Sequence, residues 1–108
     1  IHGDGQQVRG NTFVTDCVDA VVRSKDAPIG ETFNIGGGEM VSLLDVLAKL
    51  EGISGLKFQR KSAPVRAGDQ RHTFADTSKL RRLLSWEPKV GMDEGLTRQF
   101  EWQKANLV

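Results

Sequence analysis

Two arginines and an aspartate supply the groups in this sequence that are best suited to hold a phosphorylated ligand. Arg9 follows the turn-forming segment Gly3-Asp4-Gly5, and Arg66 begins the tetrapeptide Arg66-Ala67-Gly68-Asp69. Arginine presents a planar fork of donors that fits two phosphate oxygens, whereas Asp69 accepts hydrogen bonds from hydroxyl or amide groups. Two guanidinium groups that converge on one diphosphate bind it through bidentate, charge-assisted hydrogen bonds.

Each of these residues also has an ordinary structural explanation. A single arginine among 15 basic residues usually lies on a solvated surface, and Asp69 could stabilise a bend at Gly68. Asn34 could tie down its own turn through its side chain. The two histidines and the one cysteine have no metal-ligand spacing, so we expect no metal site, and we assign no catalytic residue.

Three blocks of sequence occur in an order that is typical of one enzyme family. The first runs from Gly3 to Ala20 and the second from Phe33 to Leu43. The third block contains Arg66, Gly68, Asp69, Asp76, Ser78, Lys79, Trp86 and Pro88. Together they resemble the C-terminal part of the extended short-chain dehydrogenase/reductase family, the nucleotide-sugar epimerases and dehydratases. The resemblance spans almost the whole chain.

The resemblance implies roles for individual residues. Arg9 and Arg66 fall at family positions that contact the diphosphate of the nucleotide-sugar, and Asp69 falls at one near the ribose or base. Asn34 matches an asparagine that lies close to the ligand in some members. Asn11 stands where the family has an aromatic residue that walls the pocket, so we expect affinity or substrate choice to differ. Asp69, where related dehydratases often have histidine, favours an epimerase.

The family's reactive groups are missing from this sequence. The chain contains no tyrosine, so the Tyr-x-x-x-Lys pair that supplies the family's acid/base hydroxyl is absent. The triple glycine at 36–38 fits neither phosphate-loop pattern and is better explained as a tight turn. We therefore expect residues 1–108 to be the C-terminal substrate-binding domain of a longer enzyme. As a fragment without the N-terminal Rossmann domain, which would bind NAD, it should be inactive.

The expected function is to bind a UDP-sugar or a related nucleotide-sugar by its diphosphate, within an NAD-dependent epimerase or dehydratase. The alternative is a stand-alone, non-catalytic module of the same fold that binds a ligand or a protein. A family relative used for sensing or structure is a third possibility. The resemblance implies a homodimeric parent, and we expect the isolated lobe to self-associate through exposed apolar surface.

Composition excludes several classes of partner. With 15 basic and 14 acidic residues, the chain has no charge excess for binding nucleic acid or an anionic membrane. No apolar run approaches the roughly 20 residues of a membrane span. Cys17 is the only cysteine, which excludes an internal disulfide and fits a reducing cytoplasm.

Periodicity predicts an α+β fold of about four helices with two or three short strands. The expected helices start at Thr15 or Asp16, at Ser42, at Asp76 or Thr77, and near Met92; the expected strands are 31–35, 56–61 and 71–75. The valine and leucine stripes, including Val18, Val21, Val22, Leu80, Leu83 and Leu84, should face the core with Cys17. Trp86 and Trp102 should act as packing anchors.

Overall fold

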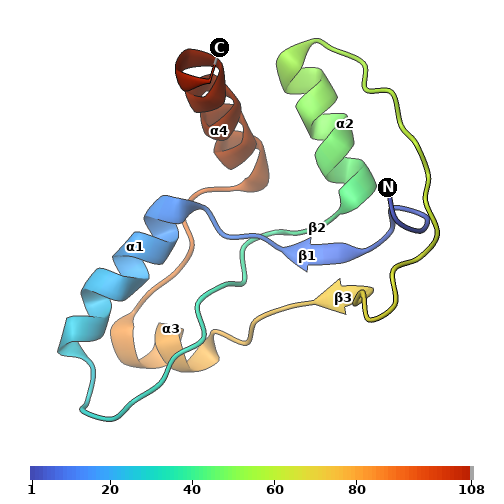
Figure 1. The fold of residues 1–108 in the computed structure, drawn as a ribbon. Helices are drawn as coiled ribbons and strands as arrows, with labels where there is room; N and C mark the ends of the chain where they lie inside the picture. Colours follow the sequence, from blue (N-terminus) through green and yellow to red (C-terminus); the bar gives the residue numbers. More distant parts are fainter. Residues whose placement is uncertain (108) are drawn as a thin grey trace.

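The α+β architecture with four helices is confirmed in the computed structural model, which describes residues 1–107 (Figure 1). In chain order the elements are β1 (Val8–Gly10), α1 (Val14–Arg23), the 3-10 turn η1 (Ser24–Asp26), β2 (Met40–Ser42), α2 (Leu43–Ser54), β3 (His72–Thr73), α3 (Ser78–Leu84) and α4 (Met92–Asn106). No helix within the described residues has both the length and the apolar composition to cross a membrane.

The three strands form one small mixed sheet in the order β2-β1-β3. β1 pairs antiparallel with β2 and parallel with β3, so Arg9 lies between Val41 and Thr73. The predicted strand at 71–75 is confirmed at its centre, His72–Thr73, whereas β2 was not predicted. The sheet therefore holds Arg9 from both sides.

Two predicted strands, 31–35 and 56–61, are absent. In segment 56–61, the Phe58 amide donates to the Glu51 carboxylate at 3.0 Å, and Lys57 and Arg60 form ion pairs with the same carboxylate. The segment is therefore a loop that wraps around the end of α2. These interactions lower the pKa of Glu51, with the Phe58 amide as the largest cause.

The segment 31–35 packs on helices instead of pairing with a strand. Phe33 lies against the core, the Lys79 ammonium lies 5.4 Å from the Phe33 ring centroid, and Lys79 also pairs with Glu31. Within the described residues no strand lies beside this segment, because all three strands belong to the sheet around β1. Strand-forming composition therefore did not produce a strand here.

Helix ends follow the sequence closely at two of the four helices. Ser42 caps α2 by accepting the Asp45 amide at 3.1 Å, as predicted. Thr77 is the N-cap residue of α3, one of the two predicted positions, although its side chain makes no capping hydrogen bond. The Asp76 carboxylate accepts the Ser78 amide at 2.9 Å instead. The prediction for α1 was wrong, because Phe13 occupies the N-cap position and no side chain caps this helix. α4 starts at Met92, as expected, and continues to Asn106.

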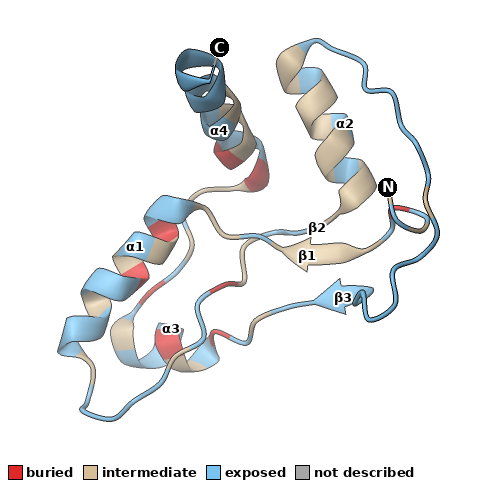
Figure 2. Ribbon diagram, in the orientation of Figure 1, coloured by how far each residue is buried: buried red, intermediate tan, exposed pale blue. Residues whose placement is uncertain are grey.

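The core lies where α1 meets α3 and is small. Ala20, Leu80 and Trp86 are almost fully buried, and Phe33 and Leu84 pack around them. In Figure 2 the buried positions are confined to a few points along the ribbon, and most of the chain is exposed or half-buried. The inward prediction is confirmed for Leu80 and Trp86.

Several residues expected in the core are exposed instead. They are Val18, Val21, Val22, Leu83 and Trp102. Cys17 is half-buried. The prediction that Val18, Val21, Val22 and Leu83 face the core, and that Trp102 anchors the packing, was therefore wrong, because the described residues do not cover these sides of the helices.

Candidate functional site

Arg9 is held in a defined position by β1 and by its own hydrogen bonds. Its Nη1 donates to the Val8 carbonyl at 2.9 Å, and its Nη2 donates to Asp69 Oδ1 at 2.8 Å. The two side chains are 34% and 32% exposed, so the pair lies at the surface with solvent access. The structure thus joins two predicted site residues that are 60 positions apart in the chain.

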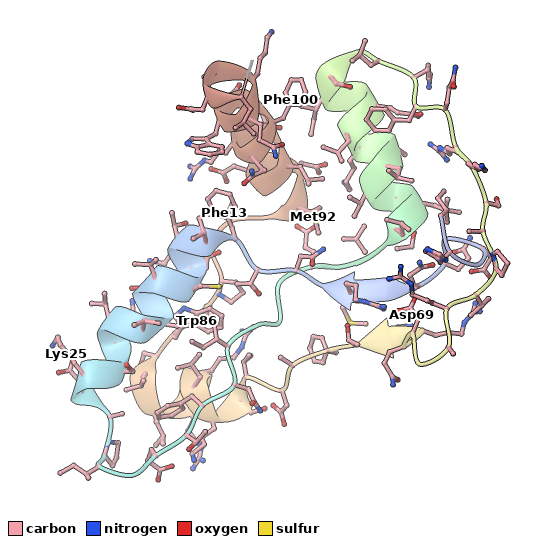
Figure 3. The ribbon with its side chains drawn as sticks, viewed as in Figure 1. Phe13, Lys25, Asp69, Trp86, Met92 and Phe100 are labelled. Carbon is pink, nitrogen blue, oxygen red and sulfur yellow. The ribbon has the colours of Figure 1, made fainter. Side chains whose placement is uncertain are left out.

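Asp69 reaches Arg9 because the segment 66–69 forms a tight turn. The Asp69 amide donates to the Arg66 carbonyl at 3.1 Å, and Gly68 has φ of 83°, a left-handed conformation that glycine adopts without strain. Arg66 begins this turn, and its side chain is solvent-exposed. The turn brings the backbone of Arg66 close to the Arg9–Asp69 pair. Figure 3 shows Asp69 in the loop before β3, beside β1.

Arg9 also lines a cavity of about 260 Å³ between β1 and the start of α2. Gln7 and Asn11 line the same cavity, since alternate residues of a strand point to the same side. Val41, Leu43 and Val46 form its apolar wall. The arrangement of one guanidinium and two amides on an apolar wall suits a polar, anionic ligand. Gln7 was missed, although its spacing of two from Arg9 is a usable signal.

A second ion pair lies next to this region. Arg71 Nη2 lies 3.1 Å from Asp4 Oδ2, and Asp4 also accepts the Gln6 amide at 3.0 Å. These bonds lower the pKa of Asp4, with the Gln6 amide as the largest cause. Asp4, Arg71 and Asp69 line one small cavity, so charged groups of both signs surround the 66–69 turn.

Asn34 lies apart from Arg9 and the turn. Its side-chain Nδ2 donates to the Asp76 carbonyl at 3.4 Å, just before α3. This bond ties the segment after α1 to the start of α3. Of the five predicted site residues, the structure therefore brings Arg9, Asn11 and Asp69 together, places Arg66 at the adjoining turn, and separates Asn34.

The triple glycine does not form a cradle for the phosphates of a dinucleotide. A side chain at Gly38 would place its Cβ 1.9 Å from the Asn11 carbonyl oxygen, and one at Gly36 would lie 2.7 Å from Ala75 Cβ. Glycine is needed at positions 36 and 38 because neighbouring backbone and side-chain atoms approach closely there. The close contacts at Gly36 and Gly38 explain these two glycines without a dinucleotide loop, and we assign no step to NAD in this chain.

An apolar cavity of about 450 Å³ lies between the starts of α1 and α4. Phe13 and Met92 face it from opposite sides, and Gly95 lets the Phe13 ring approach α4 closely (Figure 3). Thr12 also lines the cavity, and its buried hydroxyl has no hydrogen-bond partner among the described residues. Sequence reasoning missed this cavity, because its walls come from two helices almost 80 residues apart.

The chain is similar in sequence and structure to nucleotide-sugar epimerases. It is 41% identical over 104 residues to an uncharacterised UDP-glucose epimerase of Bacillus subtilis, a match covering 94% of this chain and 33% of that protein. The crystal structure of UDP-glucuronic acid 4-epimerase from Bacillus cereus, in complex with UDP-glucuronic acid and NAD, is similar with a TM-score of 0.90 and 36% identity, covering 97% of this chain and 34% of that one.

UDP-glucose 4-epimerase of Thermotoga maritima, crystallised with UDP-glucose, has a TM-score of 0.92 and 34% identity, covering 100% of this chain and 35% of that one. This chain thus spans about a third of the length of its relatives. The family model described as GDP-mannose 4,6 dehydratase matches residues 1–99. With this match and these relatives, the chain belongs to the GDP-mannose 4,6 dehydratase family, among the nucleotide-sugar epimerases and dehydratases of the short-chain dehydrogenase/reductase fold.

Proposed function

We propose that this chain is the nucleotide-sugar-binding part of an NAD-dependent nucleotide-sugar epimerase, and that it clamps the diphosphate of a UDP-sugar. The observation that carries the proposal is the meeting of Arg9 with the Arg66–Asp69 turn across about 60 residues of sequence. Packing alone does not require an exposed ion pair here, because exposed pairs contribute at most about 1 kcal/mol to stability.

The proposed roles follow from the chemistry of each group. Arg9 donates to one side of the diphosphate from the rigid centre of the sheet. Arg66, whose side chain is exposed, folds over the other side from the turn. Asp69 orients the Arg9 guanidinium in the free protein and accepts hydroxyl hydrogens from the nucleoside when ligand is bound. Gln7 and Asn11 add amide donors and acceptors beside Arg9.

A whole enzyme of this kind would be about three times as long as this chain, to judge from the relatives. We assign the chain the binding and orientation of substrate, which accelerates reaction by fixing the reacting carbon in one position. NAD belongs to the remaining part, since the close contacts at Gly36 and Gly38 explain these glycines without a dinucleotide loop. Asp69, together with relatives that are named epimerases, favours an epimerase over a dehydratase.

The test uses a chimera in which this chain replaces the matching third of the Thermotoga maritima UDP-glucose 4-epimerase. We expect Arg9→Ala and Arg66→Ala each to raise KM for UDP-glucose about 10- to 100-fold, because a hydrogen bond to a charged group contributes about 1.5–3 kcal/mol. Arg66→Lys should restore only part of the loss, since lysine lacks the bidentate fork.

Arg82→Ala is the matched control, because Arg82 is an exposed arginine on α3, away from the turn. Its KM should stay within twofold of the unsubstituted chimera. If Arg9→Ala and Arg66→Ala also stay within twofold, the diphosphate clamp is rejected. Calorimetric titration of UDP into the isolated chain tests the alternative, because a stand-alone module would bind it tightly without the rest of an enzyme.

A further inference from the structure

A second arginine–aspartate pair lies beside the Arg9–Asp69 pair of the candidate site. Arg71 Nη2 lies 3.1 Å from Asp4 Oδ2, and Asp4, Asp69 and Arg71 line one cavity of about 30 Å³. A cavity of this volume has room for about two water molecules, since one water needs about 10–15 Å³. Arg71 therefore lies near two carboxylates and pairs with one of them, Asp4.

Arg71 has a fixed backbone and an exposed side chain. Its carbonyl accepts the Val8 amide at 2.8 Å, and the next two residues form β3. The side chains of Arg71 and Asp4 are 72% and 56% exposed, and ion pairs this exposed are weak. The Arg71 guanidinium can therefore change partner while its strand stays in place.

Asp4 keeps a partner when Arg71 leaves it. Its Oδ1 accepts the Gln6 amide at 3.0 Å within the local turn. The Gln6 amide, ahead of Arg71, is the largest cause that lowers the pKa of Asp4. Because the carboxylate is also more than half exposed, water solvates the oxygen that Arg71 releases. Asp4 therefore loses little when the ion pair opens.

Asp69 depends on its single ion pair. Its carboxylate accepts from Arg9 Nη2 at 2.8 Å and has no other hydrogen-bond partner among residues 1–107. In the proposed function Arg9 turns to the diphosphate, which leaves Asp69 as an unneutralised charge beside two phosphate groups. Like charges repel, and a nucleoside hydroxyl that donates to Asp69 does not neutralise it. A cation that replaces Arg9 therefore favours binding.

We propose that Arg71 exchanges partners on ligand binding: its guanidinium leaves Asp4 and pairs with Asp69 as Arg9 turns to the diphosphate. The carboxylate left without an ion pair is then Asp4, which faces water instead of phosphate. Arg66 is not available for this role, because it belongs to the clamp. Arg71 is a positioning residue, since it acts through Asp69 and does not touch the substrate. The inference rests on the proposed function, because it requires a diphosphate at Arg9.

A passive brace makes a different prediction. If the Arg71–Asp4 pair only held the 66–69 turn against β1, removal of either partner would weaken ligand binding. Partner exchange predicts that Arg71→Ala weakens binding, whereas Asp4→Asn frees Arg71 for Asp69 and does not weaken it. Asparagine keeps an oxygen that accepts the Gln6 amide, so Asp4→Asn removes the charge and retains the turn.

The test uses the chimera with the Thermotoga maritima epimerase and measures the Kd of UDP by calorimetry, with KM and kcat for UDP-glucose. We expect Arg71→Ala to raise Kd and KM about two- to fivefold, the range for an exposed ion pair, and to leave kcat unchanged. Arg71→Lys should keep most of the affinity, because it keeps the charge. Asp4→Asn should leave Kd unchanged or lower it.

Lys25→Ala is the matched control for loss of an exposed ion pair. Lys25 pairs with Asp26, their side chains are 71% and 67% exposed, and Lys25 lies at the opposite end of the molecule from Asp69 in Figure 3. Its Kd for UDP should equal that of the unsubstituted chimera. All these side chains are exposed, so the melting temperatures should stay within about 2 °C. Arg71→Gln repeats the measurement if the alanine variant does not fold.

A double-mutant cycle identifies the new partner of Arg71. In an Asp69→Asn background, Arg71→Ala should change Kd no further, because no charge remains for Arg71 to neutralise. The proposal is overturned if Arg71→Ala leaves Kd unchanged, if its effect persists in the Asp69→Asn background, or if Asp4→Asn weakens binding as Arg71→Ala does. The clamp itself fails by another result, an unchanged KM in Arg9→Ala and Arg66→Ala, so the two proposals are distinguishable.

Discussion

Replacing Gly38 by alanine tests whether close backbone approach explains the triple glycine. The added Cβ would lie 1.9 Å from the Asn11 carbonyl oxygen, and real Cβ contacts are essentially never below 3.0 Å. The two segments must therefore move apart by roughly 1 Å, with a typical overpacking cost of about 1–3 kcal/mol. The shifted atom is backbone, so a change of rotamer cannot relieve the contact.

Gly52 provides a matched control for the same substitution. It lies inside α2, and an added Cβ would meet nothing within 4 Å. Alanine is the better helix former, so Gly52→Ala should raise the free energy of unfolding by about 0.5–1 kcal/mol. The two glycine-to-alanine changes should therefore have opposite signs.

Urea and thermal unfolding followed by circular dichroism measure both effects. For a domain of this size, a change of 1 kcal/mol in the free energy of unfolding shifts the melting temperature by about 4–8 °C. We therefore expect Gly38→Ala to lower the melting temperature by roughly 5–20 °C and Gly52→Ala to raise it by a few degrees. A Gly38→Ala variant as stable as the natural chain would refute the steric reasoning and reopen the phosphate-loop explanation. Because Asn11 lines the cavity beside Arg9, this variant should also weaken ligand binding in the chimera.

Two further predictions concern the carboxylates of Asp16 and Asp76. Asp16→Ala removes the buried carboxylate that accepts the Val90 amide at 3.0 Å. It should lower the free energy of unfolding, measured in urea, by about 1–3 kcal/mol. An unchanged urea midpoint would contradict this prediction. Hydrogen bonds from the Ser78 side chain and amide hold the pKa of Asp76 below its usual 3.8, so its stabilisation is present above pH 3.8 and lost as the pH falls through the lowered value. Asp76→Asn should therefore be less stable at pH 7 and lose this difference in acid, and a difference that persists at the lowest pH would refute the linkage.

The candidate site shows which residues sequence reasoning selected and which of them the structure brings together. Arg9, Arg66 and Asp69 were selected by residue type and family resemblance, and the Arg9–Asp69 ion pair brings two of them together. The bend at Gly68 was expected from glycine's freedom at positive φ. What could not be foreseen was the pairing of β1 with β2 and β3, because strands of two or three residues carry almost no periodic signal.

Asp16 shows where local reasoning failed. Its position before an apolar run favours a helix cap, yet it is 4% exposed and its carboxylate binds the Val90 amide. Its carbonyl accepts the Trp86 indole N–H at 2.9 Å. The two partners are 70 and 74 residues away, so no short-range pattern could reveal them.

The sequence by itself determined the existence of the four helices, the cap at Ser42, and the identity of the charged groups. These depend on hydrogen bonds and periodicities within a few residues. Only the tertiary structure decided which apolar stripes are covered. Ala20 is buried and Val18 is exposed on one helix, because burial depends on the neighbours that a face meets, and the described residues cover only one side.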